Sequence, residues 1–329
     1  MDTTSSSHSG FASGSGLHHV TAICSDAQRN LDFYCGILGL RLVKLTVNFD
    51  DPFAYHLYYG DELGRPGTIL TFFVWQGAQS ARHGNKSVEA TAFAVPVGAL
   101  NWWQEHLAAQ NVAFTSPPPR FGENLIQFHD SDGLTLEIIE SNRAGNGFAW
   151  ENGPIPIDYA IRGFHSVTIA AEATAHTAAL LGGALGFRAH ENPSLLEANR
   201  FRFEGGQGIG SVIDIACLPD APRAQTGAGG VHHIAFRVAG DAEQTRLHVL
   251  LGRENLNVSP VMDRSYFRSI YFREPGGVLF EIATDVPGFT LDESAENLGT
   301  LLQLPLQLEA YRAQIEARVS KIELPTHKK

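Results

Sequence analysis

The sequence predicts an α+β fold of four modules, each with one strand, one helix and three further strands, grouped in two tandem domains. The first observation is an internal repeat. The segment GLHHVT at residues 16–21 recurs as GFHSVT at residues 163–168, and DGLTLEI at residues 132–138 recurs as GGVLFEI at residues 276–282. The second observation is that helix and strand patterns follow each copy in the same order. Self-similarity at a long, constant spacing indicates a duplicated architecture.

The first module illustrates how the elements are assigned. Ser25 or Asp26 can cap a helix, because short polar side chains accept hydrogen bonds from the free amides of a first turn. The helix presents one apolar face, formed by Leu31, Tyr34 and Leu38. Gly39 follows where a C-terminal glycine belongs. Runs rich in β-branched and aromatic residues then predict three strands, at Arg41–Asn48, Ala54–Gly60 and Thr68–Trp75.

The same order of elements repeats along the chain. The four modules span residues 16–76, 87–142, 162–218 and 230–284. In the second module, the patterns predict a helix at Trp102–Ala109 and a last strand at Thr135–Glu140. Consecutive modules then make up an N-terminal domain at residues 16–155 and a C-terminal domain at residues 160–290.

The two ends of the chain have a different character. Residues 1–15 are rich in Ser and Gly and offer little to bury, so we expect a disordered tail. Residues 291–329 are expected to form a helical extension, with its main helix at Leu301–Val319.

Composition narrows the class of protein. The 329 residues carry a net charge of −11 and no long basic run, which argues against nucleic acid or an anionic membrane as partner. No apolar stretch has the length that a bilayer-spanning helix needs. The three cysteines have neither metal-type spacing nor a paired pattern, which favours free thiols and a cytoplasmic location.

Three residues on predicted strands are candidates for metal ligands. His19 and His233 each lie in a His-His pair, and Glu281 lies between the apolar residues Phe280 and Ile282. Side chains alternate between the two faces of a strand, so each candidate can point away from the core. Two imidazoles and one carboxylate suit a facial triad that leaves positions open on Fe(II).

The duplication provides an internal comparison for these candidates. The position of His19 is occupied by Ser166 in the other half, and that of His233 falls near Ala90. Only the carboxylate is retained, as Glu137. The fold itself therefore does not demand the two histidines, which favours a role in metal binding. Glu281 is less distinctive, because duplication alone could explain it.

Tyr271 is the best candidate for moving a proton. Tyr271 and Glu281 are equidistant from Gly276, so a regular hairpin places them opposite each other on one face. The other half has Gln127 in place of Tyr271. A phenol next to a metal-bound substrate can exchange a proton with it, although packing alone would also explain a buried tyrosine.

Two further residues have counterparts in the half that lacks the histidines. Arg264 corresponds to Arg120, and His18 corresponds to His165. Both matches weaken a functional interpretation. His56 shows no spacing signal and is assigned to the surface or to a polar core by default. Aromatic side chains of the first module could line a pocket for a flat ring, although core packing is the commoner use: Phe49, Phe53, Tyr55, Tyr58, Tyr59, Phe72, Phe73 and Trp75.

Longer stretches carry a resemblance to a known family. The four-module chain, over residues 16 to about 318, resembles the vicinal oxygen chelate superfamily, which includes glyoxalase I and the extradiol ring-cleaving dioxygenases. LRLVKLTVNFDDPFAYHLYYG at residues 40–60 and YFRSIYFREPGGVLFEIA at residues 266–283 resemble its hydroquinone dioxygenase branch. The resemblance implies curled, cup-shaped mixed sheets. It also implies that module one pairs with module four, and module two with module three.

The same resemblance implies a set of site residues. Its iron ligands fall on His19, His233 and Glu281. The residues around the iron fall on the four positions His18, Thr21, Arg264 and Tyr271. The expected function is Fe(II)-dependent opening of a para-diol ring, with both atoms of O2 incorporated and Mn(II) as an alternative metal.

Other functions remain open at this point. An extradiol catechol dioxygenase is the nearest alternative. A glyoxalase-I-like isomerase or lyase would need a further oxygen ligand, for which Asp214 is a weak candidate. A metal-free binding protein of the bleomycin-resistance type is the third. The expected partners are a small aromatic diol and O2, and the C-terminal extension could support a homo-oligomer.

Overall fold

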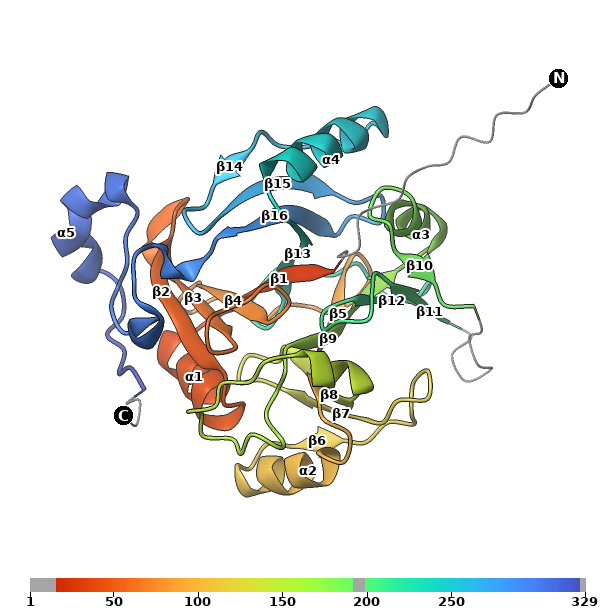
Figure 1. The fold of residues 1–329 in the computed structure, drawn as a ribbon, viewed down its shortest axis with the longest axis horizontal. Helices are drawn as coiled ribbons and strands as arrows, with labels where there is room; N and C mark the ends of the chain where they lie inside the picture. Colours follow the sequence, from red (N-terminus) through yellow and green to blue (C-terminus); the bar gives the residue numbers. More distant parts are fainter. Residues whose placement is uncertain (1–15, 192–198, 326–329) are drawn as a thin grey trace.

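The structure is a computed structural model that describes residues 16–191 and 199–325, so the expected tail at residues 1–15 lies outside it. Two eight-stranded mixed sheets form the body of the molecule, and the helices lie at its periphery (Figure 1). The predicted α+β class and the four modules of one strand, one helix and three strands are confirmed.

The first sheet combines the first and last modules, in the strand order β14-β15-β16-β13-β1-β4-β3-β2. The first module consists of β1 (Leu17–Cys24), α1 (Ala27–Leu31) with a π-helical continuation (Asp32–Ile37), β2 (Arg41–Asn48), β3 (Asp51–Gly60) and β4 (Ile69–Val74). The last module consists of β13 (Val231–Val238), α4 (Asp241–Arg253), β14 (Met262–Asp263), β15 (Phe267–Arg273) and β16 (Leu279–Pro287).

The second sheet combines the two middle modules, in the order β10-β11-β12-β9-β5-β8-β7-β6. The second module consists of β5 (Ser87–Val95), α2 (Leu100–Ala109), β6 (Phe114–Thr115), β7 (Leu125–His129) and β8 (Thr135–Glu140). The third consists of β9 (Phe164–Ala171), α3 (Ala175–Gly182), β10 (Arg188–Ala189), β11 (Arg200–Glu204) and β12 (Val212–Cys217).

Antiparallel strand pairs join the modules within each sheet. β1 pairs with β13, and β5 pairs with β9. The module pairing that the family resemblance implied is therefore the one observed. Each sheet takes strands from both halves of the chain, so the ranges 16–155 and 160–290 describe the halves of the duplication and not the two sheets.

The ends of α1 show why the first module folds as its sequence predicts. The Asp26 carboxylate accepts a 2.8 Å hydrogen bond from the backbone N–H of Arg29, as a capping residue does. Gly39 has a φ of 69°, and a Cβ there would lie 2.3 Å from Cγ1 of Ile155. Only glycine fits this position without strain.

The C-terminal extension corrects one expectation. A single helix at Leu301–Val319 is wrong, because the segment contains a 3-10 helix at Leu306–Tyr311 and a short α5 at Arg312–Glu316. Two features explain the difference. Gln303 donates its backbone N–H to the Leu45 carbonyl at 2.9 Å, so the chain here follows the edge of β2. Pro305 then disfavours a helical conformation in the residue before it.

A buried lysine holds this extension against the first sheet. Lys44 on β2 is fully buried, and its Nζ lies 2.5 Å from Oδ1 of Asp292 and in contact with Glu293 Oε2. A buried ammonium needs such partners, since removing one member of a buried ion pair leaves an uncompensated charge.

Among the described residues, no helix is both long and apolar enough to cross a bilayer, and the three cysteines are free thiols.

Replacing Lys44 should destabilise the protein strongly. Lys44→Met keeps most of the side-chain volume but leaves Glu293 buried without its cation. We expect the free energy of unfolding to fall by about 3–5 kcal/mol, measured by urea denaturation. Lys321→Met, which removes an exposed lysine, should have little effect. Equal stability of the two variants would contradict this account of the anchor.

Candidate metal centre

The three predicted ligands come together from three neighbouring strands. His19 lies on β1, His233 on β13 and Glu281 on β16, and all three are buried. The two Nε2 atoms are 3.2 Å apart. Oε2 of Glu281 lies 3.3 Å from His19 Nε2 and 2.9 Å from His233 Nε2. Within the described part of the chain, this is the one group of metal-ligating side chains found to converge.

The charge states of these groups suit metal binding. Burial raises the pKa of the Glu281 carboxyl, but the adjacent His19 and His233 outweigh it and hold the pKa well below its usual value. Burial lowers the pKa of His233. The site therefore offers a carboxylate and a neutral imidazole, which are the forms that bind metals.

One oxygen of the Glu281 carboxylate has no hydrogen-bond partner. Ser269 Oγ donates to Oε1 of Glu281, whereas Oε2 has no partner in hydrogen-bonding geometry although it faces both imidazoles. A buried oxygen without a hydrogen bond is costly. A cation held by the two Nε2 atoms and Oε2 would satisfy it, so the residues present fit a divalent metal.

Each ligand histidine contacts the histidine that precedes it in the sequence through its Nδ1 atom. Nδ1 of His19 lies 2.9 Å from Nδ1 of His18, and Nδ1 of His233 lies 2.8 Å from Nδ1 of His232. These contacts leave both Nε2 atoms directed at the centre, and contacts of this kind orient metal ligands. Burial, His233 and Arg273 lower the pKa of His232 to about 3. Burial also lowers the pKa of His18 well below its usual value.

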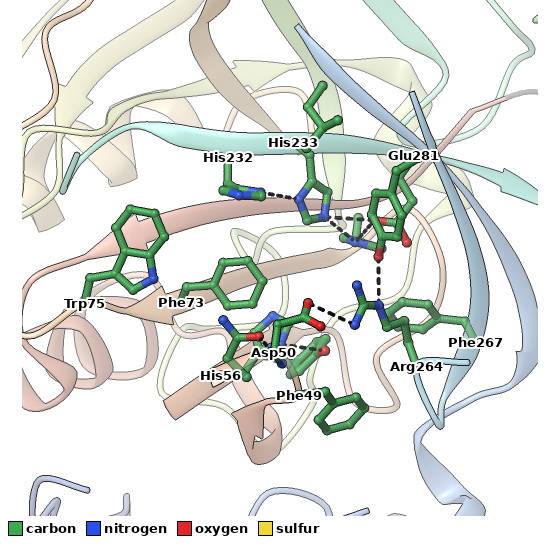
Figure 2. Close-up of a pocket in the computed structure, with 15 residues that line it drawn as sticks. Phe49, Asp50, His56, Phe73, Trp75, His232, His233, Arg264, Phe267 and Glu281 are labelled. Atoms are coloured by element: carbon green, nitrogen blue, oxygen red, sulfur yellow. Dashed lines mark hydrogen bonds and ion pairs between the residues drawn. The ribbon is translucent and has the colours of Figure 1, made fainter. Parts of the chain in front are cut away.

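Tyr271 lies beside the ligands, opposite Glu281 in the β15–β16 ladder as the hairpin pattern predicted. Its hydroxyl accepts a 3.1 Å hydrogen bond from Arg264 Nε, and Arg264 Nη1 lies 3.2 Å from Oδ2 of Asp50 (Figure 2). Burial and the charge of Glu281 raise the pKa of Tyr271. The phenol therefore stays protonated, and its own hydrogen remains available to a ligand.

A chain of hydrogen bonds links Thr21 to Tyr58 through Thr71 and His56. Thr21 on β1 lies opposite Thr71 on β4, with the two hydroxyl oxygens 2.8 Å apart. Thr71 Oγ1 is 2.8 Å from His56 Nε2, and His56 Nδ1 is 2.9 Å from the Tyr58 hydroxyl. Because a neutral imidazole carries its hydrogen on either nitrogen, this chain can run in either direction.

A cavity of about 320 Å³ opens beside the ligands, and its size is in the range of small-molecule sites. His19, His233 and Glu281 belong to its lining, together with Phe49, Phe73, Trp75 and Phe267. Trp75 and Phe73 lie on one side of the cavity, and Arg264 and Phe267 lie on the other (Figure 2). Of the predicted aromatic cluster, Phe49, Tyr58, Phe73 and Trp75 line this cavity. Tyr59 and Phe72 are core residues, and Phe53 and Tyr55 line a different cavity. His18 and Thr21 do not line it and contact the site from behind.

Comparison with known proteins decides the family. Residues 16–138 match the model of the Glyoxalase/Bleomycin resistance protein/Dioxygenase superfamily. A Bacillus subtilis (strain 168) protein provisionally named ring-cleaving dioxygenase MhqO is 46% identical over 301 residues, which cover 92% of this chain and 94% of that protein. The chain belongs to this superfamily.

Other relatives agree with this assignment. The chlorohydroquinone/hydroquinone 1,2-dioxygenase of Sphingobium indicum is 36% identical over 91% of this chain and 94% of that protein. A crystal structure of a provisionally assigned Bacillus subtilis dioxygenase matches with a TM-score of 0.90 and 45% identity, over 95% of this chain and 99% of that one. Glyoxalase I from Zea mays matches with a TM-score of 0.61 and 12% identity, over 83% and 93% of the chains, which shows the shared fold. The names of the first relatives support an oxygenase activity in this superfamily member.

The second sheet shows what the duplicated position looks like without the histidines. Glu137 is buried there, forms an ion pair with Arg120 and accepts a 2.9 Å hydrogen bond from Gln127. Thr168 pairs with Ala90 as Thr21 pairs with His233, so the predicted correspondence of positions is correct. An arginine and an amide thus contact the carboxylate where the first sheet has two imidazoles.

The structure adds site residues that the sequence patterns missed. His56, expected at the surface or in a polar core, is half-buried and lines the cavity. Asp50, His232 and Ser269 also contact the predicted residues. No spacing signal could have found His56, because its contacts depend on how β3 pairs with β4. His232 could have been found from the sequence, because it forms a conspicuous His-His pair with His233. The repeat, however, offered no counterpart with which to compare it.

Metal content tests the ligand set directly. His19→Ala removes one of three donors, so we expect it to lose bound Fe(II) or Mn(II) after anaerobic loading and desalting, whereas the parent protein keeps it. Metal analysis by mass spectrometry gives the measurement. Glu137→Gln is the matched control for Glu281→Gln, since both remove a buried carboxylate. If the two carboxylate variants lose metal equally, the assignment to the first sheet is wrong.

Proposed function

We propose that this chain is an Fe(II)-dependent ring-cleaving dioxygenase that opens a hydroquinone-type ring and incorporates both atoms of O2. The observation that carries the proposal is the convergence of His19, His233 and Glu281 beside an aromatic-lined cavity. Two histidines and one carboxylate are the ligand pattern of non-haem Fe(II) oxygenases. The name of the Sphingobium indicum relative supports a para-diol as substrate class.

Bound at these ligands, Fe(II) would supply open positions for substrate and O2 and transfer electron density between them. Mn(II) accepts the same donors. In the overall reaction, the ring bond next to one hydroxyl-bearing carbon breaks, and the two oxygen atoms of O2 end up in a carboxylate and an aldehyde or acyl group. The remaining contributions come from the side chains of the chain itself.

The cavity walls suit a flat ring. Phe49, Phe73 and Trp75 present aromatic surface, and Leu279 adds an apolar contact. Aromatic pairs stabilise one another in stacked and edge-on arrangements. A ring held against these walls would direct one hydroxyl toward the ligand side of the cavity.

Tyr271 and Arg264 are placed to stabilise a negative charge on the ring oxygen of the substrate. The phenol of Tyr271 is protonated and oriented by the Arg264 guanidinium, so it can donate a hydrogen bond to a deprotonated ring hydroxyl. The positive charge of Arg264 favours the anionic form of the same oxygen. A proton held at this position can be returned when the product forms.

His18 acts through a ligand, and Thr21 acts through a chain of hydrogen bonds that reaches the cavity. His18 orients the imidazole of His19. The Thr21 hydroxyl is the inner end of the Thr71–His56–Tyr58 chain, which connects it to the cavity wall at Tyr58. This arrangement would let His56 shift its tautomer as hydrogen bonding at the site changes.

The alternative functions receive less support. The glyoxalase-type alternative needed Asp214 as a further ligand, but Asp214 lies on β12 in the second sheet and pairs with Arg202. A catechol remains a second substrate class to test, since the cavity residues do not distinguish it from a para-diol. A metal-free binding role gives no reason for two imidazoles and a carboxylate to converge in one buried group.

Oxygen uptake tests the reaction. Protein loaded anaerobically with Fe(II) should consume O2 in a 1:1 ratio with hydroquinone or a substituted hydroquinone, and isotope-labelled O2 should place both atoms in the product. Glu281→Gln should abolish uptake. Uptake with catechols alone would replace the substrate class, and no uptake with any aromatic diol would overturn the proposal.

Loss of the Tyr271 hydroxyl should separate chemistry from metal binding. Tyr271→Phe keeps the ring in place but removes the proton donor, so we expect kcat to fall about 10²–10⁴-fold with metal content unchanged. Tyr311→Phe, at an exposed position, is the control and should match the parent enzyme. Full turnover by Tyr271→Phe would assign this tyrosine to packing.

A further inference from the structure

A second cavity adjoins the proposed catalytic cavity. It has a volume of about 290 Å³ and shares three residues with the first, namely Trp75, His232 and Leu279. Trp75 and His232 stand on the side of the catalytic cavity away from Arg264 (Figure 2). A group attached to a bound ring and passing these residues would therefore enter the second cavity.

The second cavity is lined by positive charge. Arg82, Lys86, Arg223 and Arg273 all border it, together with His83, and its lining contains no Asp or Glu. None of the four cations forms an ion pair with any residue in the described ranges, in a protein whose net charge is −11. Cations gathered in a concave site without counter-charges create a local positive potential that attracts anions.

Hydrogen bonds hold two of these cations in place without neutralising them. Arg82 Nη2 donates to the Arg223 carbonyl at 2.9 Å, and Arg273 Nη1 donates to the Gly277 carbonyl at 2.9 Å. Backbone carbonyls carry no net charge, so both guanidinium groups keep their positive charge. Each also keeps free N–H groups, because a guanidinium has five donors.

The two chain segments that carry Arg82 and Arg223 are hydrogen-bonded to each other. Arg82 pairs with Gln225 and Asn85 pairs with Arg223 in short β-bridges between the β4–β5 and β12–β13 connections. Asn85 Nδ2 also donates to the Ala221 carbonyl at 3.0 Å. Arg82, Lys86 and Arg223 are therefore carried by two connections between the sheets that pair with each other, whereas Arg273 is the last residue of β15.

Lys86 provides a separate sign of constraint. It has a φ of 68°, which non-glycine residues rarely adopt, and its N–H donates to the Ala170 carbonyl at 2.9 Å. Its side chain lies against Gly277, where a Cβ would be 3.3 Å from Lys86 Cδ. Gly277 belongs to the hairpin that leads to Glu281. The strained backbone thus directs Lys86 toward the strand that carries a metal ligand, and strain of this kind concentrates at functional sites.

We propose that Arg82, Lys86, Arg223 and Arg273 form a carboxylate-binding subsite next to the catalytic cavity. It rests on the proposed function in that its ligand is a ring compound in that cavity. The carboxylate can belong to a side chain of the substrate or to the ring-opened product. Guanidinium groups bind carboxylates through paired hydrogen bonds, which fits a lining rich in arginine.

A binding measurement tests the subsite without any turnover. The probes are 4-hydroxyphenylacetate and 4-ethylphenol, which have similar size and differ by the carboxylate. We expect the intact protein to bind the acid about tenfold more tightly at low ionic strength, from several partly screened charge interactions. The preference should shrink as salt is raised. Calorimetry or quenching of tryptophan fluorescence gives the affinities.

Two variants decide which residues cause this preference. The double variant Arg82→Gln, Arg273→Gln should reduce the affinity ratio of the two probes to about twofold or less, by the same reasoning on charge. Arg188→Gln removes an exposed arginine from β10 in the second sheet and should keep the parent ratio. Arg223→Gln alone serves if the double variant does not fold. An equal affinity for both probes in the parent, or an unchanged ratio in the variants, overturns the subsite.

Kinetics distinguish the two sources of the carboxylate. If the substrate supplies it, 2,5-dihydroxyphenylacetate should have a lower KM than ethylhydroquinone, and the double variant should raise that KM selectively. If the product supplies it, the double variant should weaken product inhibition during turnover of ethylhydroquinone. Absence of turnover with either diol contradicts the proposed function, while the binding ratio still decides the subsite.

Discussion

The antiparallel pairing of β1 with β13 is the contact on which the rest of the site depends. It places Thr21 opposite His233 and His19 opposite Ala235, so that the two imidazoles meet although more than two hundred residues separate them in the chain. The parallel pairing of β13 with β16 then adds Glu281, and that of β1 with β4 adds Thr71. Because all these groups stand on hydrogen-bonded strands, their mutual geometry is set by the ladder and does not depend on loops.

The two sheets share one architecture but differ in what contacts their carboxylates. In the second sheet, carboxylates are neutralised within the protein: Arg120 pairs with the buried Glu137, and Arg202 pairs with the buried Asp214 and the half-buried Glu123. Burial raises the pKa of Glu123, but His165 and Arg202 outweigh it and lower the pKa to about 2. In the first sheet the corresponding cation on the ligand carboxylate is missing, and Arg264 instead contacts Tyr271 and Asp50. The first sheet therefore keeps its carboxylate free to bind a metal.

The sequence predicted the features that repeat or that lie within one strand. Strand bounds such as Arg41–Asn48 and Thr135–Glu140 agreed because alternation and turn residues are local signals. Tyr271 opposite Glu281 followed from hairpin symmetry alone. The pairing of the first module with the last could not be derived from local patterns, and it came only from family resemblance. The contacts of His56 with Thr71 and Tyr58 depend on the register between strands. The error at Leu301–Val319 has the same origin, because pairing with the edge of β2 overrode helical propensity.

The distribution of the ligands along the chain also constrains how the protein matures. His19 belongs to the first strand and Glu281 to the last, so the centre does not exist until nearly the whole chain has been synthesised and the outermost modules have met. Contacts between such distant segments form late, because the entropy of closing a long loop opposes them. A chain that ends before β16 would lack Glu281, and the last module folded by itself would bring His233 and Glu281 together but would lack His19. Metal acquisition is therefore coupled to completion of the fold, and the metal would stabilise the closed first sheet over any partly assembled form.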